Sequence, residues 1–220
     1  MRRICIFDWA GTIVDKGSIA PLVAFRQTFK QFGISNISDS QINQYMGMDK
    51  YTHLFNLTKN DELTQKMYPH LIMNMKDAVK QYSIPVPGVN EIFRYLLSKK
   101  YIIGTTSGYN RELLNIAINT AFLNGMMLPI SIASDEVKNP RPKPDMILQN
   151  IRLLSLLHGQ NFDNPPIVKV GDTVIDIQEG CSVNAICNIG ISNDPKLTGQ
   201  MYENGATHVI KNLQEIFTIL

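Results

Sequence analysis

Apolar and polar residues alternate along this chain in blocks. Short apolar runs are separated by longer stretches in which apolar residues recur every three or four positions. The short runs predict strands over Arg3–Phe7, Ile102–Thr106, Ile130–Ala133, Ile167–Val170, Ala185–Ile189 and Thr207–Ile210. The longer stretches predict helices over Val89–Ser98, Arg111–Leu123, Asp145–His158, Val174–Val183, Lys196–Glu203 and Leu213–Leu220. Strands without a polar face that alternate with helices indicate an α/β fold, a doubly wound parallel sheet with helices on both faces.

Residues 18–84 interrupt this alternation. The stretches "IAPLVAFRQTFKQFG" and "LTQKMYPHLIMNMKDAVKQY" have helical apolar spacing, and "IPVPGV" supplies a hinge of two prolines and a glycine. We therefore predict an α/β core of residues 1–17 plus 85–220 and an inserted all-helical cap over 18–84. Met67, Met73 and Met75 are expected in the core of that cap.

Composition excludes several classes of protein. The net charge of +2 is too small to favour nucleic acid or an anionic membrane, so neither is expected as a partner. The apolar runs are shorter than the ~20 residues of a membrane helix. The chain starts without the pattern of a signal peptide, and its three cysteines have no metal-binding spacing. Together these features predict a cytoplasmic protein.

Four clusters of polar residues follow predicted strands or precede a helix. They are "DWAGT" from Asp8, "TTSG" ending at Gly108, "RPKPD" from Arg141, and "GDTVID" ending at Asp176. In a parallel sheet these strand ends meet at one edge, where ligands bind. Carboxylates, hydroxyls and cations in this arrangement suit phosphoryl transfer.

Each cluster supplies a different part of that chemistry. Asp8 could attack phosphorus, which requires Mg²⁺ held by Asp8, Asp172 and the backbone carbonyl of Ala10. Ser107, the backbone near Gly108 and a cation would bind the phosphoryl oxygens. Arg141 is favoured for that cation over Lys143. Asp176 would orient a water near the metal, or would be an ordinary acidic residue at a helix start.

The order of the four clusters resembles the haloacid dehalogenase superfamily of aspartyl-phosphate hydrolases with a helical cap. In that superfamily the first motif usually reads DxDxT, and its second aspartate protonates the leaving alkoxide. Ala10 stands at that position here. The resemblance therefore implies a reaction that does not need this acid.

One branch of the superfamily, the phosphonoacetaldehyde hydrolases or phosphonatases, carries this alanine. The chain resembles it in "FDWAGTIVDKGSIAPL", "MGMDKYTH", "TTSGYNREL", "RPKP" and "KVGDTVIDIQEG". The resemblance implies that Lys50 forms a Schiff base with the aldehyde of a small organophosphorus substrate, so that the C–P bond can break. It also implies pocket roles for Met46 and His53, against the alternatives of a core methionine and a helix-surface histidine.

Two other functions stay open at this point. A related phosphonatase-like group has the same first motif, and its cap lysine would bind the phosphate of another small phosphorylated metabolite. A catalytically silent binding protein is the third reading. The cap of this chain is shorter than that of phosphonatases, and Ser18 stands where they have a cysteine near the hinge. The resemblance also allows a homodimer.

Overall fold

A single parallel sheet forms the centre of the protein. The computed structural model describes residues 2–220, and within them six strands pair in the order β3-β2-β1-β4-β5-β6. The strands are β1 (Ile4–Asp8), β2 (Ile102–Ser107), β3 (Ile130–Ala133), β4 (Ile167–Gly171), β5 (Cys187–Ile191) and β6 (His208–Ile210). All pairs are parallel, which confirms the predicted α/β class.

The topology places a switch point beside β1. The chain begins at β1, moves outward through β2 and β3, and then returns to β4 on the other side of β1. The strand order therefore extends from β1 toward β2 on one side and toward β4 on the other. The crevice at the carboxyl ends of these strands is where such sheets bind ligands. Asp8 ends β1, and Asp172 follows Gly171 at the end of β4.

Side chains on each strand alternate between two buried layers. Ile4 and Ile6 of β1 pack with Ile167 of β4 in a layer against α7 (Asp145–His158). The alternate residues Cys5 and Phe7 belong to the larger apolar cluster on the opposite face.

The remaining core helices agree closely with the sequence pattern. They are α5 (Val89–Ser98), α6 (Arg111–Leu123), α8 (Val174–Ser182) and α9 (Pro195–Glu203). Two predictions need correction. The pattern at Leu213–Leu220 forms a 3₁₀ helix, η2, over Leu213–Thr218, and the predicted strand Ala185–Ile189 lies two residues later as β5. A further 3₁₀ turn, η1 (Ser134–Glu136), follows β3.

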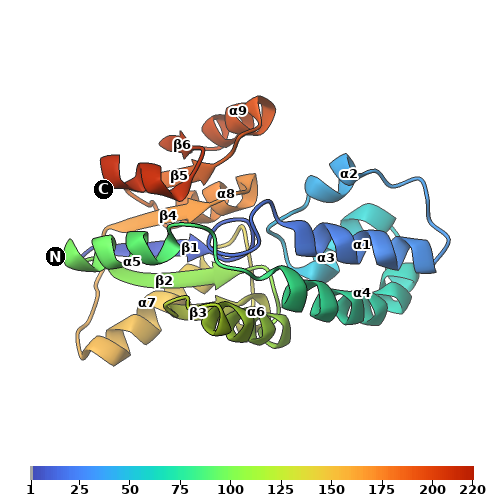
Figure 1. The fold of residues 1–220 in the computed structure, drawn as a ribbon, viewed down its shortest axis with the longest axis horizontal. Coiled ribbons are helices and arrows are strands. Elements are labelled where there is room, and N and C mark those ends of the chain that lie inside the picture. The colour runs from blue at the N-terminus through green and yellow to red at the C-terminus, as the bar shows by residue number, and fades with distance from the viewer. Residues whose placement is uncertain (1) are drawn as a thin grey trace.

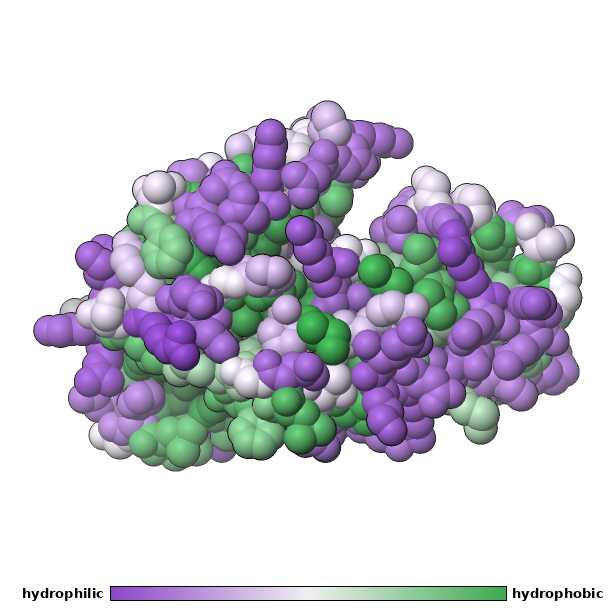
Figure 2. Space-filling view, viewed as in Figure 1, coloured by the Kyte–Doolittle hydropathy of each residue, from purple (hydrophilic) through white to green (hydrophobic). Residues whose placement is uncertain are grey.

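Residues 19–82 form four helices beyond the carboxyl ends of the strands, as Figure 1 shows. These are α1 (Ile19–Gln31), α2 (Asp39–Asn43), α3 (Lys50–Thr58) and α4 (Asp61–Tyr82). We refer to them as the helical unit. The space-filling view shows an indentation between this unit and the sheet domain (Figure 2).

The expected methionine core of the helical unit is correct at two positions of three. Met67 and Met75 are fully buried, whereas Met73 is 67% exposed. Met67, Leu71 and Met75 recur every four residues on one face of α4, and Met73 falls on the opposite face. The prediction for Met73 was wrong because it ignored this period.

Two further observations concern the chain as a whole. Within residues 2–220, no helix combines the length and apolar character needed to cross a membrane. The cysteines form no disulfide among the described residues, and Cys5 and Cys187 are buried.

Candidate active site

Three carboxylates meet at the switch point. Asp8, Asp172 and Asp176 each offer an oxygen, and these oxygens lie within 4.8 Å of one another. The close approach of the first loop depends on Gly11, whose φ is +87°. A Cβ atom on Gly11 would lie 1.9 Å from Oδ2 of Asp172, so only glycine fits there.

Burial and the neighbouring charges disfavour the ionised forms of Asp8 and Asp172, whereas Arg141 and Lys169 lower the pKa of Asp176 against the effect of its burial. Burial, together with the charge of Asp176, raises the pKa of Asp8 to about 6, although Arg141 opposes the shift. Burial and the charge of Asp8 raise the pKa of Asp172 well above its ordinary value. The ionised forms of Asp8 and Asp172 are therefore the ones that a further cation would stabilise.

The donor chemistry fits Mg²⁺, which prefers oxygen ligands and carboxylates. Asp8, Asp172 and the carbonyl of Ala10 are the residues that would hold it. Ser18 connects two of these groups, because its hydroxyl lies 2.9 Å from Oδ2 of Asp172 and 3.2 Å from the carbonyl oxygen of Ala10. A divalent cation would relieve the repulsion that raises the pKa of Asp172.

Arg141 is the cation that contacts Asp8, and Lys143 is exposed. Arg141 is 4% exposed, and its Nη1 donates to Oδ1 of Asp8 at 2.6 Å. Its Nη2 donates to both the carbonyl and the hydroxyl of Thr106, at 2.7 and 2.6 Å. The guanidinium is thus fixed beside the carboxylate that would attack phosphorus.

Asp176 is an acidic residue at a helix start, one of the two readings that the sequence left open, and it also makes ion pairs within the site. Its Oδ2 accepts from the backbone N–H and the hydroxyl of Thr173, which forms a capping box at the start of α8. Its Oδ1 lies 3.0 Å from Arg141 and 3.0 Å from Lys169. One oxygen therefore caps the helix, and the other belongs to the charged site.

Ser107 ends β2 at the same edge, and Gly108 follows it. Ser107 is 2% exposed, and its hydroxyl accepts from the backbone N–H of Tyr109 at 3.1 Å. A Cβ atom on Gly108 would lie 2.5 Å from the carbonyl oxygen of Gly47 and 2.6 Å from that of Met48. The helical unit therefore touches the sheet domain at this glycine.

Lys50 approaches the site from the helical unit. It is the first residue of α3, where Asp49 caps the helix by accepting from the N–H of Thr52 at 2.9 Å. The side chain is 5% exposed; its Nζ donates to the carbonyl of Met48 at 3.1 Å and lies 5.5 Å from the ring centroid of Tyr109. Burial lowers the pKa of Lys50 to about 8, against the opposing charges of Asp49 and Asp8. The free amine is therefore accessible near neutral pH.

Met46 and His53, both of the helical unit, are buried. Met46 is 8% exposed and belongs to the apolar core. His53 is fully buried, and its ring centroid lies 4.1 Å from that of Phe25. The alternative of a helix-surface histidine was wrong. Burial lowers the pKa of His53 well below its ordinary value, so the ring is neutral.

Comparison with known proteins identifies the family. The model of the haloacid dehalogenase-like hydrolases matches residues 5–187. The chain belongs to this hydrolase family. Its relatives include a phosphonoacetaldehyde hydrolase of Latilactobacillus sakei, 30% identical over 98% of this chain and 93% of the relative. Another from Bacillus cytotoxicus is 33% identical over 80% of this chain and 70% of the relative.

Solved structures support the same fold. A phosphonoacetaldehyde hydrolase-like protein from Oleispira antarctica superposes with a TM-score of 0.85 at 25% identity, covering 99% of this chain and 91% of the other. A β-phosphoglucomutase-like protein from Thermotoga maritima has a TM-score of 0.69 at 20% identity, covering 100% of this chain and 98% of the other. The second likeness concerns the fold alone.

The sequence analysis gave no role to three residues of this hydrolase site. Thr106 contacts Arg141 directly, and Lys169 and Glu179 complete a buried ionic network around it. A signal for Lys169 was present, because a lysine inside the apolar run "IVKV" is buried and needs a partner. No comparable signal marked Glu179, whose spacing on α8 also fits a solvent-exposed residue.

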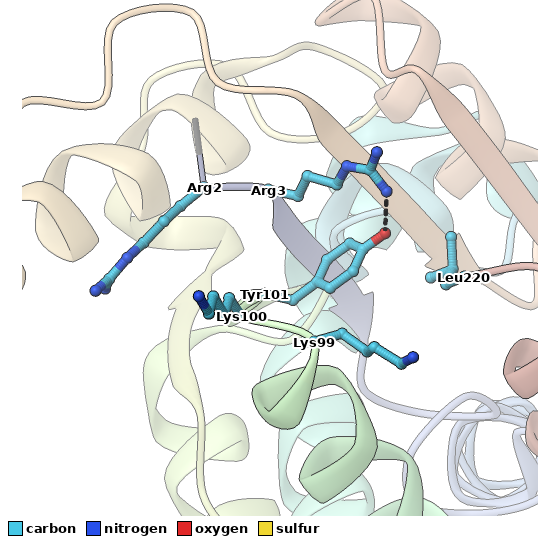
Figure 3. Close-up of a pocket in the computed structure, with 6 residues that line it drawn as sticks. All are labelled: Arg2, Arg3, Lys99, Lys100, Tyr101 and Leu220. Atoms are coloured by element: carbon cyan, nitrogen blue, oxygen red, sulfur yellow. Dashed lines mark hydrogen bonds between the residues drawn. The ribbon is translucent and has the colours of Figure 1, made fainter.

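A second concentration of cations lies at the opposite, amino end of the sheet. Arg2, Arg3, Lys99 and Lys100 surround a hollow of about 390 Å³, and Arg3 donates to the hydroxyl of Tyr101 at 3.0 Å. Figure 3 shows Arg2 and Lys100 directed to one side, and Arg3 and Lys99 to the other. Because the charged ends diverge, we assign no ligand to this hollow.

The buried lysine gives a prediction about stability. The pKa of Lys50 is lowered from 10.5 to about 8, so at pH 7 the buried positive charge reduces the free energy of unfolding by about 3 kcal/mol. Lys50→Met should therefore raise the free energy of unfolding at pH 7, by an amount of that order, in metal-free protein. Between pH 8 and 10.5 the unfolded chain binds the proton that the folded chain has lost, so wild-type stability rises with pH there.

Urea unfolding of both proteins at pH 7 and pH 10 measures this effect. The difference in the free energy of unfolding between Lys50→Met and wild type should fall from about 3 kcal/mol at pH 7 to about 1 kcal/mol at pH 10. An advantage that is equal at both pH values would mean that lost packing or another group, and not the buried charge, causes the difference.

Proposed function

We propose that this hydrolase cleaves the C–P bond of phosphonoacetaldehyde, giving acetaldehyde and phosphate. One observation carries the proposal. Lys50 is a buried amine with a lowered pKa at a phosphoryl-transfer site whose usual acid position is Ala10. The named relatives support the same substrate.

The amine and the alanine fit one mechanism. Carbon is a very poor leaving group, and protonation by an aspartate at position 10 would not improve it. The neutral amine of Lys50 attacks the aldehyde carbon, and loss of water gives a protonated imine. When the C–P bond breaks, its electron pair enters the imine and forms an enamine.

The sheet domain supplies the nucleophile. One carboxylate oxygen of Asp8 attacks phosphorus as the C–P bond breaks, which forms an aspartyl phosphate. A first water hydrolyses the aspartyl phosphate. The enamine takes a proton on carbon, and a second water hydrolyses the imine to acetaldehyde and restores Lys50.

The groups around Asp8 would neutralise charge on the phosphoryl group and limit the access of solvent. Mg²⁺ bound by Asp8, Asp172 and the Ala10 carbonyl would neutralise the phosphoryl oxygens as the carboxylate approaches. Arg141 orients Asp8 and adds positive charge, and Ser107 and the Gly108 backbone would bind the transferring group. Gly108 lies against Gly47 and Met48 of the helical unit, and this close approach would limit the access of bulk water to the reacting atoms.

Product analysis tests the proposal. The protein with Mg²⁺ is incubated with phosphonoacetaldehyde, and acetaldehyde and phosphate are both measured. A panel of small phosphate esters is run in parallel. Equimolar acetaldehyde and phosphate are expected. Turnover of a phosphate ester without acetaldehyde release would instead favour the phosphonatase-like reading.

The pKa of Lys50 predicts the pH dependence of imine formation. The reactive form is the neutral amine, so below about pH 8 the rate should fall about tenfold for each unit of pH. Above that value the rate should level off. Stopped-flow measurement of imine formation, with the aldehyde in excess, measures this profile. A rate that stays flat from pH 6 to 9 would contradict the assignment of Lys50 as the amine.

A further inference from the structure

Lys169 is a charged residue at the centre of a buried strand. It is fully buried on β4, where its backbone lies opposite Ile6 of β1. Alternation along the strand points it to the same face as Ile167, toward α8. A lysine so placed is destabilising unless its charge is paired.

Each contact of Lys169 is made with a group that also contacts Arg141. Its Nζ lies 2.9 Å from Oε2 of Glu179, and 3.0 Å from Oδ1 of Asp176. The same Oε2 accepts from Nε of Arg141 at 2.8 Å, and the same Oδ1 lies 3.0 Å from Nη1. The two cations and the two carboxylates thus form a closed ring of four ion pairs.

Thr106 of β2 also contacts this ring of ion pairs. Its hydroxyl donates to Oε2 of Glu179 at 3.0 Å and accepts from Nη2 of Arg141 at 2.6 Å. The sheet register puts Thr106 directly opposite Asp8. The whole network therefore lies immediately beneath the nucleophile.

Removal of Lys169 would change the balance of charge around Arg141. Among residues 2–220, Arg141 is then the one cation left within ion-pair distance of Asp8, Asp176 and Glu179. Glu179 and Asp176 belong to one helix and lie deeper than Asp8. Their combined attraction would draw the guanidinium away from Oδ1 of Asp8.

We propose that Lys169 is a positioning residue that keeps Arg141 on the nucleophile by neutralising Glu179 and Asp176. Lys169 touches no reacting atom; it acts through the carboxylates that it shares with Arg141. The effect on substrate turnover rests on the proposed function. The effect on phosphate binding does not, because any phosphoryl group at this site meets Arg141.

Loss of stability alone does not distinguish a positioning role from a structural one. Removing one member of a buried ion pair is destabilising whatever its role, whereas replacing both members is often tolerated. A positioning role predicts something that a structural role does not: activity should follow the charge balance around Arg141, and not the stability of the fold.

Four proteins test the proposal. Lys169→Met removes the charge and keeps an apolar stem of similar length. Lys169→Met with Glu179→Gln restores the balance by removing one negative charge as well. Asn150→Ala is the matched control, because Asn150 is equally buried but binds the Thr105 carbonyl on β2, away from Arg141. The wild type completes the set.

Each protein is assayed for kcat and KM with phosphonoacetaldehyde and Mg²⁺, for calorimetric binding of inorganic phosphate with Mg²⁺, and for thermal unfolding. Lys169→Met should lower kcat by about 100-fold with KM within about threefold, and weaken phosphate binding by about tenfold. The double variant should regain at least tenfold in kcat. Asn150→Ala should lose stability and keep kcat within about twofold of wild type.

Several outcomes would overturn the proposal. Lys169→Met with wild-type kcat and phosphate affinity would show that the position of Arg141 at Asp8 does not depend on Lys169. Loss of activity in step with unfolding temperature, including in Asn150→Ala, would mean a structural role. If wild type binds phosphate but releases no acetaldehyde, the proposed function fails and the phosphate titrations still test Lys169.

Discussion

Lys50→Arg is expected to abolish release of acetaldehyde from phosphonoacetaldehyde. Arginine keeps the positive charge and much of the length, but its guanidinium stays protonated and does not form an imine. Without an electron sink, the electron pair of the C–P bond has no acceptor. We expect turnover to fall by about 10³-fold or more.

The measurement needs controls for folding and for charge. Lys66→Arg makes the same substitution at an exposed lysine on α4, whose partner is Glu62 at 2.7 Å, and should leave kcat unchanged. Lys50→Arg should still bind inorganic phosphate with Mg²⁺, because Asp8 and Arg141 are intact. An arginine variant that turns over at the wild-type rate would exclude the imine mechanism.

Asp8→Asn should have an equally large effect for a different reason. The amide is a poor nucleophile, so no aspartyl phosphate forms, and kcat should fall by about 10⁴-fold. Stability should not fall, because burial and the charge of Asp176 already raise the pKa of Asp8 to about 6, so its ionised form is disfavoured in the fold. Active sites commonly trade stability for function in this way.

Kinetics and thermal unfolding of Asp8→Asn give both results. Asp163→Asn is the control, since Asp163 is exposed and bonded only to the neighbouring Asn161 side chain among the described contacts. Its kcat should equal that of wild type. Asp8→Asn with substantial activity would assign the attack on phosphorus to another group and would remove the basis of the mechanism.

Much of the fold could be predicted from the sequence because its signals are local. The helices at Val89–Ser98, Arg111–Leu123 and Asp145–His158 coincide with their predicted ranges, since each buries a periodic apolar face. At Leu213–Leu220 the same period was present, but the chain forms a short 3₁₀ helix. Apolar spacing over so few residues does not distinguish the two.

The residues of the candidate site that follow a strand could be predicted from the sequence. The buried residues that contact them from a helix could not. Asp8, Ser107 and Asp172 follow apolar runs, so topology brings them to one edge. Glu179 gave no such signal, because its contacts with Arg141 and Lys169 depend on how α8 packs against the sheet. Buried ionic partners are determined by three-dimensional packing, which a linear pattern does not record.

The helical unit and the sheet domain contribute different halves of the proposed reaction. Asp8 and Arg141 belong to the sheet domain, and Lys50 comes from α3. The two parts lie against each other at Gly108, where a Cβ atom would collide with two carbonyl oxygens. The division explains how a fold shared with phosphatases could acquire C–P chemistry through one lysine.

Borohydride trapping tests the central claim most directly. Wild-type protein is mixed with phosphonoacetaldehyde and sodium borohydride, and the modified peptide is located by mass spectrometry. We predict loss of activity and one reduced adduct, carried by Lys50 and absent from Lys50→Arg. An adduct on a different lysine, or none while acetaldehyde is still produced, would contradict a Schiff base at Lys50.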